Sequence, residues 1–337
     1  MNFIELSVRA RSALPSLQTG DPMEILLSPA ILFFALGIVA ASIRSSLEIP
    51  EAVSKGLAIY LMTAIGLKGG VQVSTSGVTS ELVVAGLTGI GLSLLLPVPA
   101  FWAMRRLAKL DTVNAGAIAA HYGSVSVVTF VTGMAILEAG GLPVAGYMVA
   151  VLAMMEAPAI ITGIWLAKRG EGAGARALRG HLSHAMRDGA VVLLLGSFIV
   201  GLAVGKSGFD PIRPVFEHAF GGVLCLFLLE MGLVAARHLM RTRSVTPVIA
   251  ALAVVIAFVN GTVGVLAGAL IGLDTGSTAA LGILAGSASY IAAPAAIRLA
   301  LPEADIGLPL AMSLAITFPF NVLVGIPIFT TLARLLT

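Results

Sequence analysis

Two copies of a Gly-Ser-x-Ser motif contain the residues of this sequence best suited to bind a small ion. The first copy is Gly123-Ser124-Val125-Ser126 and the second is Gly286-Ser287-Ala288-Ser289. Glycine weakens a helix and serine competes for its backbone hydrogen bonds, so each motif predicts an interruption of the apolar helix around it. Backbone groups released in an apolar medium are costly unless they line a cavity or bind a ligand.

The half-helices that follow the two motifs, 127–138 and 290–301, begin with N–H groups that lack intrahelical partners and carry partial positive charge. Such N-termini bind an anion without a buried arginine. The half-helices before the motifs end in carbonyl groups, which suit Na⁺, and serine hydroxyls can bind either ion. We therefore expect all eight motif residues to form an anion site, with Ser124, Ser126 and Ser289 also binding Na⁺. The alternative is that these small residues only allow helices to pack closely.

Three further polar residues fall inside apolar stretches. A carboxylate such as Glu156 near a span centre is a functional candidate that either binds Na⁺ or caps loosened backbone. Its alternative is a protonated side chain bonded to a carbonyl near the Pro158 kink. The Asn260 amide either coordinates Na⁺ or bonds across helices, and we favour the second role. His121 is a candidate for pH sensing, but the second half has Leu284 at that place, so we expect a packing histidine.

Other charged residues have simpler interpretations. Lys68 and Glu230 lie near the ends of predicted spans, where snorkelling or pairing is expected. Lys68 is also placed to attract anions to an outer vestibule. Asp111 and Asp274 each precede a span, which is typical of N-caps or of first-turn acids favoured by the helix dipole.

The composition defines the elements that position these residues. Of 337 residues, 58% are hydrophobic and 11% are charged, against about 25% charged in an ordinary soluble domain. A soluble enzyme or nucleic-acid binder needs more polar surface and is excluded. The net charge of +3 is too small to indicate polyanion binding. The single cysteine, Cys225, forms no intrachain disulfide, and no Cys/His cluster indicates zinc.

The sequence predicts an all-α polytopic membrane protein with ten transmembrane helices. Residues 1–24 are too polar for the apolar region of a signal peptide and are expected to form an external arm. Two halves follow, residues 25–167 and 184–337, separated by a hydrophilic linker at 168–183. The predicted spans lie at roughly 25–43, 50–67, 81–104, 112–137, 144–167, 184–205, 214–236, 246–271, 275–300 and 307–335.

The two halves are related by an internal repeat. An offset of 163 residues superposes the Asp, Thr, Gly, Ser and Ser residues around the two serine motifs without a gap. The motifs occupy the fourth and ninth spans, each the fourth of its half, and Pro158 and Pro319 lie near the middle of the two fifth spans. Each half crosses the membrane five times, which is an odd number, so the second half begins on the side opposite to the first. The two copies therefore have opposite orientations, and the repeat is inverted. This arrangement is typical of secondary transporters.

The basic residues predict the orientation of the chain. Most of the 20 Lys and Arg residues fall on the odd-numbered connections or at the adjoining span ends. The positive-inside rule then places the central linker in the cytoplasm and both termini outside.

Several segments resemble the sodium-dependent bicarbonate transporter family known from cyanobacteria, and the resemblance runs along essentially the whole chain. The longest matching block is His121-Tyr122-Gly123-Ser124-Val125-Ser126-Val127-Val128-Thr129-Phe130. The other matching segments are Gly66-Leu67-Lys68-Gly69-Gly70, Gly146-Tyr147-Met148 and Met155-Glu156-Ala157-Pro158-Ala159-Ile160.

The resemblance implies a ten-helix protein of the bacterial inner membrane with a five-plus-five inverted repeat, gate and core subdomains, and trimeric assembly. It also implies uptake of bicarbonate together with Na⁺ by an elevator-type movement, at a site formed by two crossing broken helices. By match of motif, that site contains Gly123, Ser124, Val125, Ser126, Gly286, Ser287, Ala288 and Ser289. Members with a longer linker are controlled by a PII-related protein, and the short linker here argues against such a partner.

Three other functions are alternatives to Na⁺-coupled bicarbonate uptake. The same fold could transport another small anion or a carboxylate, which sequence does not distinguish. An intramembrane hydrolase using Ser124, His121 and Glu156 is disfavoured because Ser287 has no matching histidine. A channel would lack saturable, Na⁺-dependent uptake. We expect no enzyme activity and no organic cofactor, with Na⁺ as the co-transported ion.

Overall fold

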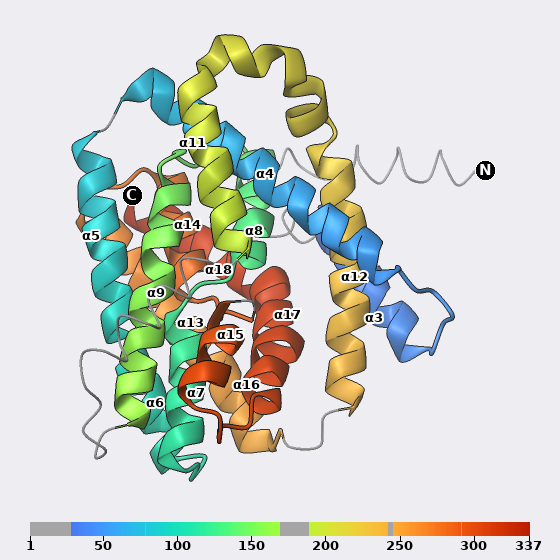
Figure 1. Cartoon of the computed structure of the whole chain (residues 1–337), viewed down its shortest axis with the longest axis vertical. Helices are drawn as coiled ribbons and strands as arrows, with labels where there is room; N and C mark the ends of the chain where they lie inside the picture. Colours follow the sequence, from blue (N-terminus) through green and yellow to red (C-terminus); the bar gives the residue numbers. More distant parts are fainter. Residues whose placement is uncertain (1–27, 78, 169–188, 242–244, 291) are drawn as a thin grey trace.

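The structure is a computed structural model that describes residues 28–77, 79–168, 189–241, 245–290 and 292–337. The described residues form helices and no strand (Figure 1). Seven helical segments are long and apolar enough to cross a membrane, which confirms the predicted class of protein. They are Glu51–Thr75, Ser80–Arg106, Thr112–Ala139, Met148–Ala167, Phe220–His238, Pro247–Leu270 and Gly307–Leu336. The predicted arm at 1–24 and residues 169–183 of the predicted linker lie outside the described residues.

The helices follow the predicted spans closely along both halves. The first half contains α3 (Pro29–Ser42), α4 (Glu51–Ser76), α5 (Ser80–Leu95), α6 (Pro97–Arg106), α7 (Thr112–Gly123), α8 (Val127–Ala139) and α9 (Met148–Ala167). The second half contains α11 (Gly189–Phe209), η1 (Asp210–Ile212), η2 (Pro214–His218), α12 (Phe220–Arg241), α13 (Pro247–Leu270), α14 (Thr275–Ala285) and α15 (Ala292–Ala300). The last predicted span consists of α16 (Gly307–Ala311), η3 (Met312–Thr317), α17 (Phe318–Phe320), η4 (Asn321–Gly325) and α18 (Ile326–Leu336).

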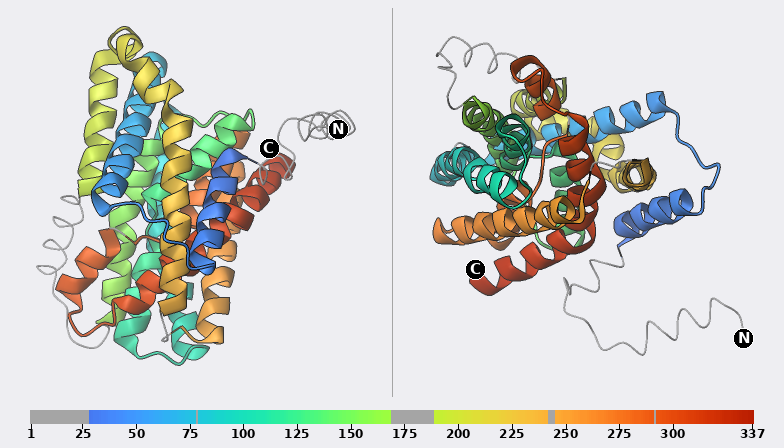
Figure 2. Two further views of the ribbon diagram at one scale, coloured as in Figure 1. Left: turned by 90° about the vertical axis from the view of Figure 1, so that its right-hand side faces the viewer. Right: turned by 90° about the horizontal axis from the view of Figure 1, so that it is seen from below.

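Four helices, α3, α4, α11 and α12, form a panel beside the remaining helices, which we term the core bundle (Figures 1 and 2). Within the panel, α4 packs along α11 and α3 packs along α12. Glycines allow both contacts, because a Cβ atom on Gly70 would lie 2.0 Å from the Phe198 carbonyl oxygen and one on Gly37 would lie 2.1 Å from that of Leu229. Small residues at these points bring the helix backbones together, as is common for helices in lipid.

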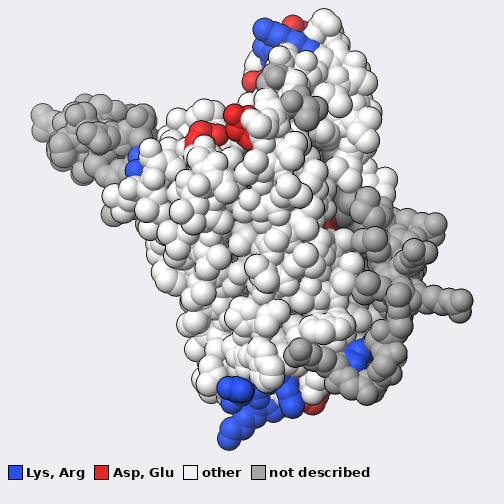
Figure 3. All heavy atoms as spheres, turned by 90° about the vertical axis from the view of Figure 1, so that its left-hand side faces the viewer, with Lys and Arg blue, Asp and Glu red and all other residues white. Residues whose placement is uncertain are grey.

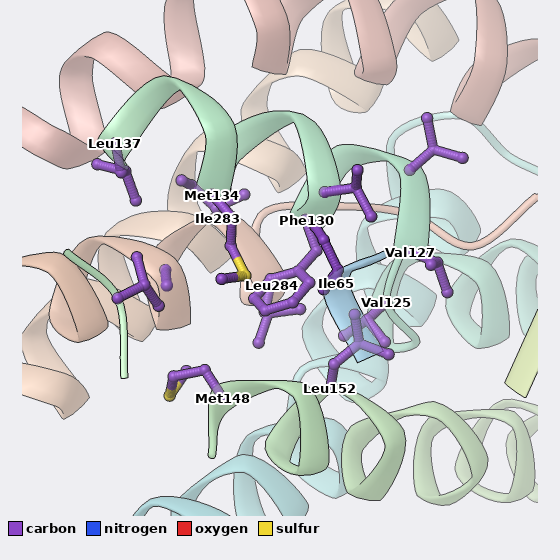
Figure 4. Packing of buried hydrophobic residues seen from close by; sticks show 14 of the residues in the cluster. Ile65, Val125, Val127, Phe130, Met134, Leu137, Met148, Leu152, Ile283 and Leu284 are labelled. Carbon is purple, nitrogen blue, oxygen red and sulfur yellow. The ribbon is translucent and has the colours of Figure 1, made fainter. Parts of the chain in front are cut away.

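The core bundle surrounds α8, which is buried over most of its length, with its C-terminal residues Glu138 and Ala139 exposed. Phe130 and Met134 of α8 lie among Met148 and Leu152 of α9 and Ile283 of α14 (Figure 4). Dispersion contacts of this density fix the position of α8, and with it the position of the first serine motif at its N-terminus.

The surface has the pattern expected of a protein in lipid. On the face shown in Figure 3, charged side chains gather toward the two ends of the long axis and leave a largely uncharged belt between them. Large apolar side chains such as Leu87, Leu95 and Val255 are half or more exposed on α5 and α13. Exposed apolar surface of this extent indicates contact with lipid or with another protein.

Candidate ion-binding site

The first interruption lies within the predicted motif. The Asp111 side chain accepts a hydrogen bond from the Asn114 backbone N–H at 2.9 Å and caps α7, which ends at Gly123. Ser124 and Ser126 are extended, with φ of −80° and −105°, and α8 begins at Val127 as predicted. The Ser126 hydroxyl accepts from the Thr129 N–H at 3.2 Å, so this serine caps the second half-helix.

The second interruption has the same construction. Asp274 accepts from the Ser277 N–H at 2.9 Å and caps α14, which ends at Ala285. Among the described residues, the half-helix after the motif is helical from Ala292, and Tyr290, where the helix was predicted to begin, is not helical. Ser289 nevertheless caps this half-helix, accepting from the Ala293 N–H at 3.2 Å. The N-cap roles expected for Asp111 and Asp274 are therefore confirmed.

The two interruptions are in direct contact with each other. The Ser126 N–H donates to the Ser287 hydroxyl oxygen at 2.8 Å. The Ser289 N–H donates to the His121 carbonyl oxygen at 2.9 Å. All eight predicted site residues are buried, and the four serines are 1% to 4% exposed. The residues of the two motifs thus form one buried cluster.

Two asparagines bond to the carbonyl ends of the broken helices. The Asn260 amide on α13 donates to the Tyr122 carbonyl oxygen at 3.1 Å, which is the cross-helix role favoured from sequence. Asn321 in η4 donates to the Gly286 carbonyl oxygen at 2.9 Å. Asn321 is 1% exposed, and its amide oxygen has no hydrogen-bond partner among the described residues. Sequence reasoning missed Asn321, although an asparagine within an apolar span was a sufficient signal.

Glu156 borders the first interruption from α9. The Ser124 hydroxyl donates to its backbone carbonyl oxygen at 3.1 Å, and the residue is 3% exposed. Nearby, the Ser93 hydroxyl donates to the Met155 carbonyl oxygen and accepts from the Ala159 N–H at 3.0 Å. Met155 and Ala159 are one helical turn apart around Pro158, so Ser93 bridges the turn of α9 that contains the proline. Ser93 was not among the predicted site residues.

Aromatic side chains close the site from the C-terminal segment. The Tyr122 and Thr317 hydroxyls share a hydrogen bond of 2.6 Å, which ties the end of α7 to η3. The Tyr290 ring packs edge-on against Phe318, with centroids 6.2 Å apart. The ring nitrogen Nδ1 of His121 lies 2.7 Å from the Ala117 carbonyl oxygen, as expected for a packing histidine.

The electrostatics of the site come from backbone dipoles and not from basic side chains. No lysine or arginine is fully buried among the residues whose burial is described. Those residues also contain no group of three or more His, Cys, Asp or Glu side chains suited to a transition metal. Hydroxyl, carbonyl and amide groups remain, and oxygens of this kind are the ligands that a hard monovalent cation accepts. Ahead of α8 the backbone at Ser124 and Ser126 is extended, and backbone N–H groups at a helix N-terminus are donors that suit an anion.

Lys68 and Glu230 lie outside the site, and each bonds to a neighbouring side chain. Lys68 is paired as expected, with its ammonium 2.9 Å from a Glu138 carboxylate oxygen. Glu230 lies in the middle of α12 and is 8% exposed, hydrogen-bonded to the Ser54 hydroxyl. The prediction that Glu230 lies near a span end is wrong. Residues 214–218 form η2, and the helix that contains Glu230 begins at Phe220 and continues to Arg241.

Multiple apolar helices around two interrupted helices that meet in a buried cluster of polar groups are typical of secondary membrane transporters. The family model of the Na⁺-dependent bicarbonate transporter superfamily matches residues 29–334. The chain belongs to this superfamily, which confirms the resemblance drawn from the motifs, and it is a Na⁺-dependent transporter and not an enzyme. None of the curated proteins compared with the chain matches it.

Proposed function

We propose that the protein is a symporter that takes up bicarbonate with Na⁺ through the site formed by the two serine motifs. The contact between the Ser126 N–H and the Ser287 hydroxyl oxygen is the observation that carries the proposal. It joins the N-terminus of one half-helix to the break of the other. An anion between them would meet N–H donors from both halves of the chain.

Bicarbonate fits the donors available there. It is small, planar and monovalent, so backbone N–H groups and hydroxyls can balance it without a full positive charge. The Ser287 hydroxyl now accepts from Ser126 and donates to the Leu284 carbonyl oxygen at 2.7 Å. A bound anion would accept the Ser126 hydrogen bond in place of Ser287, and the Ser287 hydroxyl could then rotate to donate to the anion as well.

Na⁺ completes the site on its carbonyl side. The proposed ligands are Ser124, Ser126, Ser289, Glu156 and Asn260. The Tyr122 carbonyl oxygen accepts one hydrogen bond from Asn260, which leaves its second lone pair for a cation. Na⁺ next to bicarbonate raises the affinity for the anion, and linkage requires the anion to raise the affinity for Na⁺ by the same factor.

The proposed mechanism is an elevator movement of the core bundle against the panel, built on an inverted repeat with ten spans. The glycine contacts support the repeat. Gly37 of α3 and Gly201 of α11 lie within one residue of the 163-residue offset, as do Gly70 of α4 and Gly232 of α12. A Cβ atom on any of them would meet a backbone atom of the partner helix at 2.3 Å or less. The α3–α12 contact therefore corresponds to the α11–α4 contact under the repeat.

The same proposal includes a homotrimer in the bacterial inner membrane, with both termini outside and the central linker in the cytoplasm. A cysteine introduced at Thr337 tests the orientation. A membrane-impermeant thiol reagent should label it in intact cells, and protection from the reagent would contradict the proposed topology.

Labelled bicarbonate uptake into proteoliposomes tests the function. An inward Na⁺ gradient should drive saturable accumulation, and an equal K⁺ gradient should not. Ser42→Ala is the control for variants that remove a serine hydroxyl from the site, because the exposed Ser42 hydroxyl donates to the Ile38 carbonyl oxygen within α3. Competition by other small anions tests the alternative substrate. Stronger accumulation of a carboxylate than of bicarbonate, under the same gradient, would assign the site to that carboxylate.

A further inference from the structure

A polar cavity lies between the panel and the core bundle, away from the serine motifs. Its volume is about 260 Å³, and its charged lining consists of Lys68, Lys206, Arg213, Glu138 and Glu217. The panel supplies Lys68 from α4 and Lys206 from α11, while Glu138 comes from α8 in the core bundle. We term this cavity the vestibule. It lies at the span ends that the sequence predicts to face outside.

The vestibule has one cation that no carboxylate neutralises. Arg213 pairs with Asp210 at 2.6 Å and with Glu217 at 3.4 Å. Lys68 pairs with Glu138 at 2.9 Å. Lys206 forms no ion pair within the part of the chain that the structure describes. Asp210, Glu138 and Glu217 balance the three cations in number, so the positive charge available to an anion is local to Lys206. An unpaired charge of this kind attracts ions of the opposite sign.

Local structure holds the two lysines at the cavity. Lys206 follows Gly205, whose φ of +60° turns the chain out of the α-helical path and is open to glycine without strain. The Lys68 ammonium lies 5.9 Å from the centre of the Phe220 ring and its side chain is 27% exposed. It is thus held by α12 on one side and by Glu138 on the other.

We infer that the vestibule is a capture site for a small monovalent oxyanion, in which Lys206 and Lys68 hold the anion before it reaches the serine motifs. Glu138 competes with the anion for Lys68. This inference rests on the proposed function for the identity of the anion as bicarbonate. Glu138 is 12 residues beyond Ser126 along α8, so the two sites are about 18 Å apart and can be altered separately.

Competition by Glu138 keeps the capture weak, which suits a site that must release its ion. The anion takes the place of a carboxylate at Lys68, so binding there exchanges one ion pair for another. The charges of the vestibule also lie at or near solvent, and their effect should therefore fall steeply as salt shortens the Debye length from about 30 Å at 0.01 M to about 3 Å at 1 M.

The test measures the KM for bicarbonate in proteoliposomes at saturating Na⁺, at low and at high ionic strength. The double variant K68Q/K206Q should raise KM about three- to tenfold at low ionic strength, with kcat unchanged. The increase should disappear at high ionic strength. E138Q frees Lys68 and should lower KM under the same low-salt conditions. Lys55→Gln is the control, because Lys55 pairs with Glu51 on an exposed stretch of α4 outside the vestibule.

Binding of ¹³C-bicarbonate, followed by NMR line broadening, separates this inference from the proposed function. Broadening that persists in S124A/S287A and is lost when K68Q/K206Q is added to that variant would support the vestibule, even in a protein that does not transport bicarbonate. Transport with the same KM in K68Q/K206Q, K55Q and the unaltered protein would overturn the vestibule and leave the proposed function intact. A KM increase that is independent of salt would also overturn it.

Discussion

The Ser126 N–H donates to the Ser287 hydroxyl at 2.8 Å, across 161 residues of sequence. Each of these serines belongs to a separate break in a separate half of the chain. One hydrogen bond therefore couples the geometry of the two breaks, so a change in the backbone at one break alters the hydrogen bonding of the other.

Replacement of Ser287 by alanine should abolish bicarbonate uptake while the protein is still expressed and inserted. The variant loses the acceptor of the Ser126 N–H and one proposed anion donor, and an unsatisfied buried donor costs about 1–3 kcal/mol. Initial uptake rates in proteoliposomes, normalised to reconstituted protein, are the measurement. Ser124→Ala should behave alike, since its hydroxyl also bonds within the site. Uptake at the unaltered rate in either variant would remove that serine from the site.

Glu156→Gln should raise the Na⁺ concentration needed for half-maximal uptake. The substitution keeps the shape of this 3% exposed side chain but removes its charge, so a cation at the site loses an ionic ligand. The Na⁺ dependence of uptake at fixed bicarbonate is the readout. An unaltered Na⁺ dependence would instead favour a carboxyl group that only bonds to backbone near Pro158.

Asn321→Leu should destabilise the protein by about 1–3 kcal/mol, because it leaves the buried Gly286 carbonyl oxygen without its donor. Thermal unfolding in detergent should show a clear decrease in the midpoint temperature. Thr262→Ala, on the exposed face of α13, removes a hydroxyl that bonds only within its own helix and serves as the control. Equal midpoints for Asn321→Leu and Thr262→Ala would show that Asn321 does not hold the second break.

Gly70→Ala should disrupt the panel, since a Cβ atom there would lie 2.0 Å from the Phe198 carbonyl oxygen and the backbones of α4 and α11 would have to separate. Overpacking of this kind costs about 1–3 kcal/mol. Gly56→Ala is the matched control on the same helix, because nothing lies within 4 Å of its Cβ position. Thermal stability should fall for the first variant only. A similar change in stability for both variants would show that the close contact of Gly70 with Phe198 does not determine the stability of the panel.

The serine motifs and the caps could be predicted from sequence because their signals are local. A Gly-Ser-x-Ser segment in an apolar run conflicts with a continuous helix whatever surrounds it, and Asp111 and Asp274 precede their helices by one residue. The internal repeat then predicted that the two motifs form a single site.

Contacts between distant residues could not be predicted in the same way. Neither the Lys68–Glu138 pair nor the insertion of Ser93 at the Pro158 kink leaves a pattern in the sequence around either partner. Hydropathy also misplaced Glu230, because it does not distinguish the residues of η2 from those of the α-helix that follows. Tertiary packing determines these contacts and helix boundaries, and the sequence around any one residue carries no signal for them.

Equilibrium binding of bicarbonate to the purified protein, titrated with and without Na⁺, tests the central claim most directly. The account predicts that Na⁺ lowers the Kd for bicarbonate, that bicarbonate lowers the Kd for Na⁺ by the same factor, and that S124A/S287A loses this linked binding. Linked binding of unaltered strength in S124A/S287A would show that the paired breaks do not hold the ions.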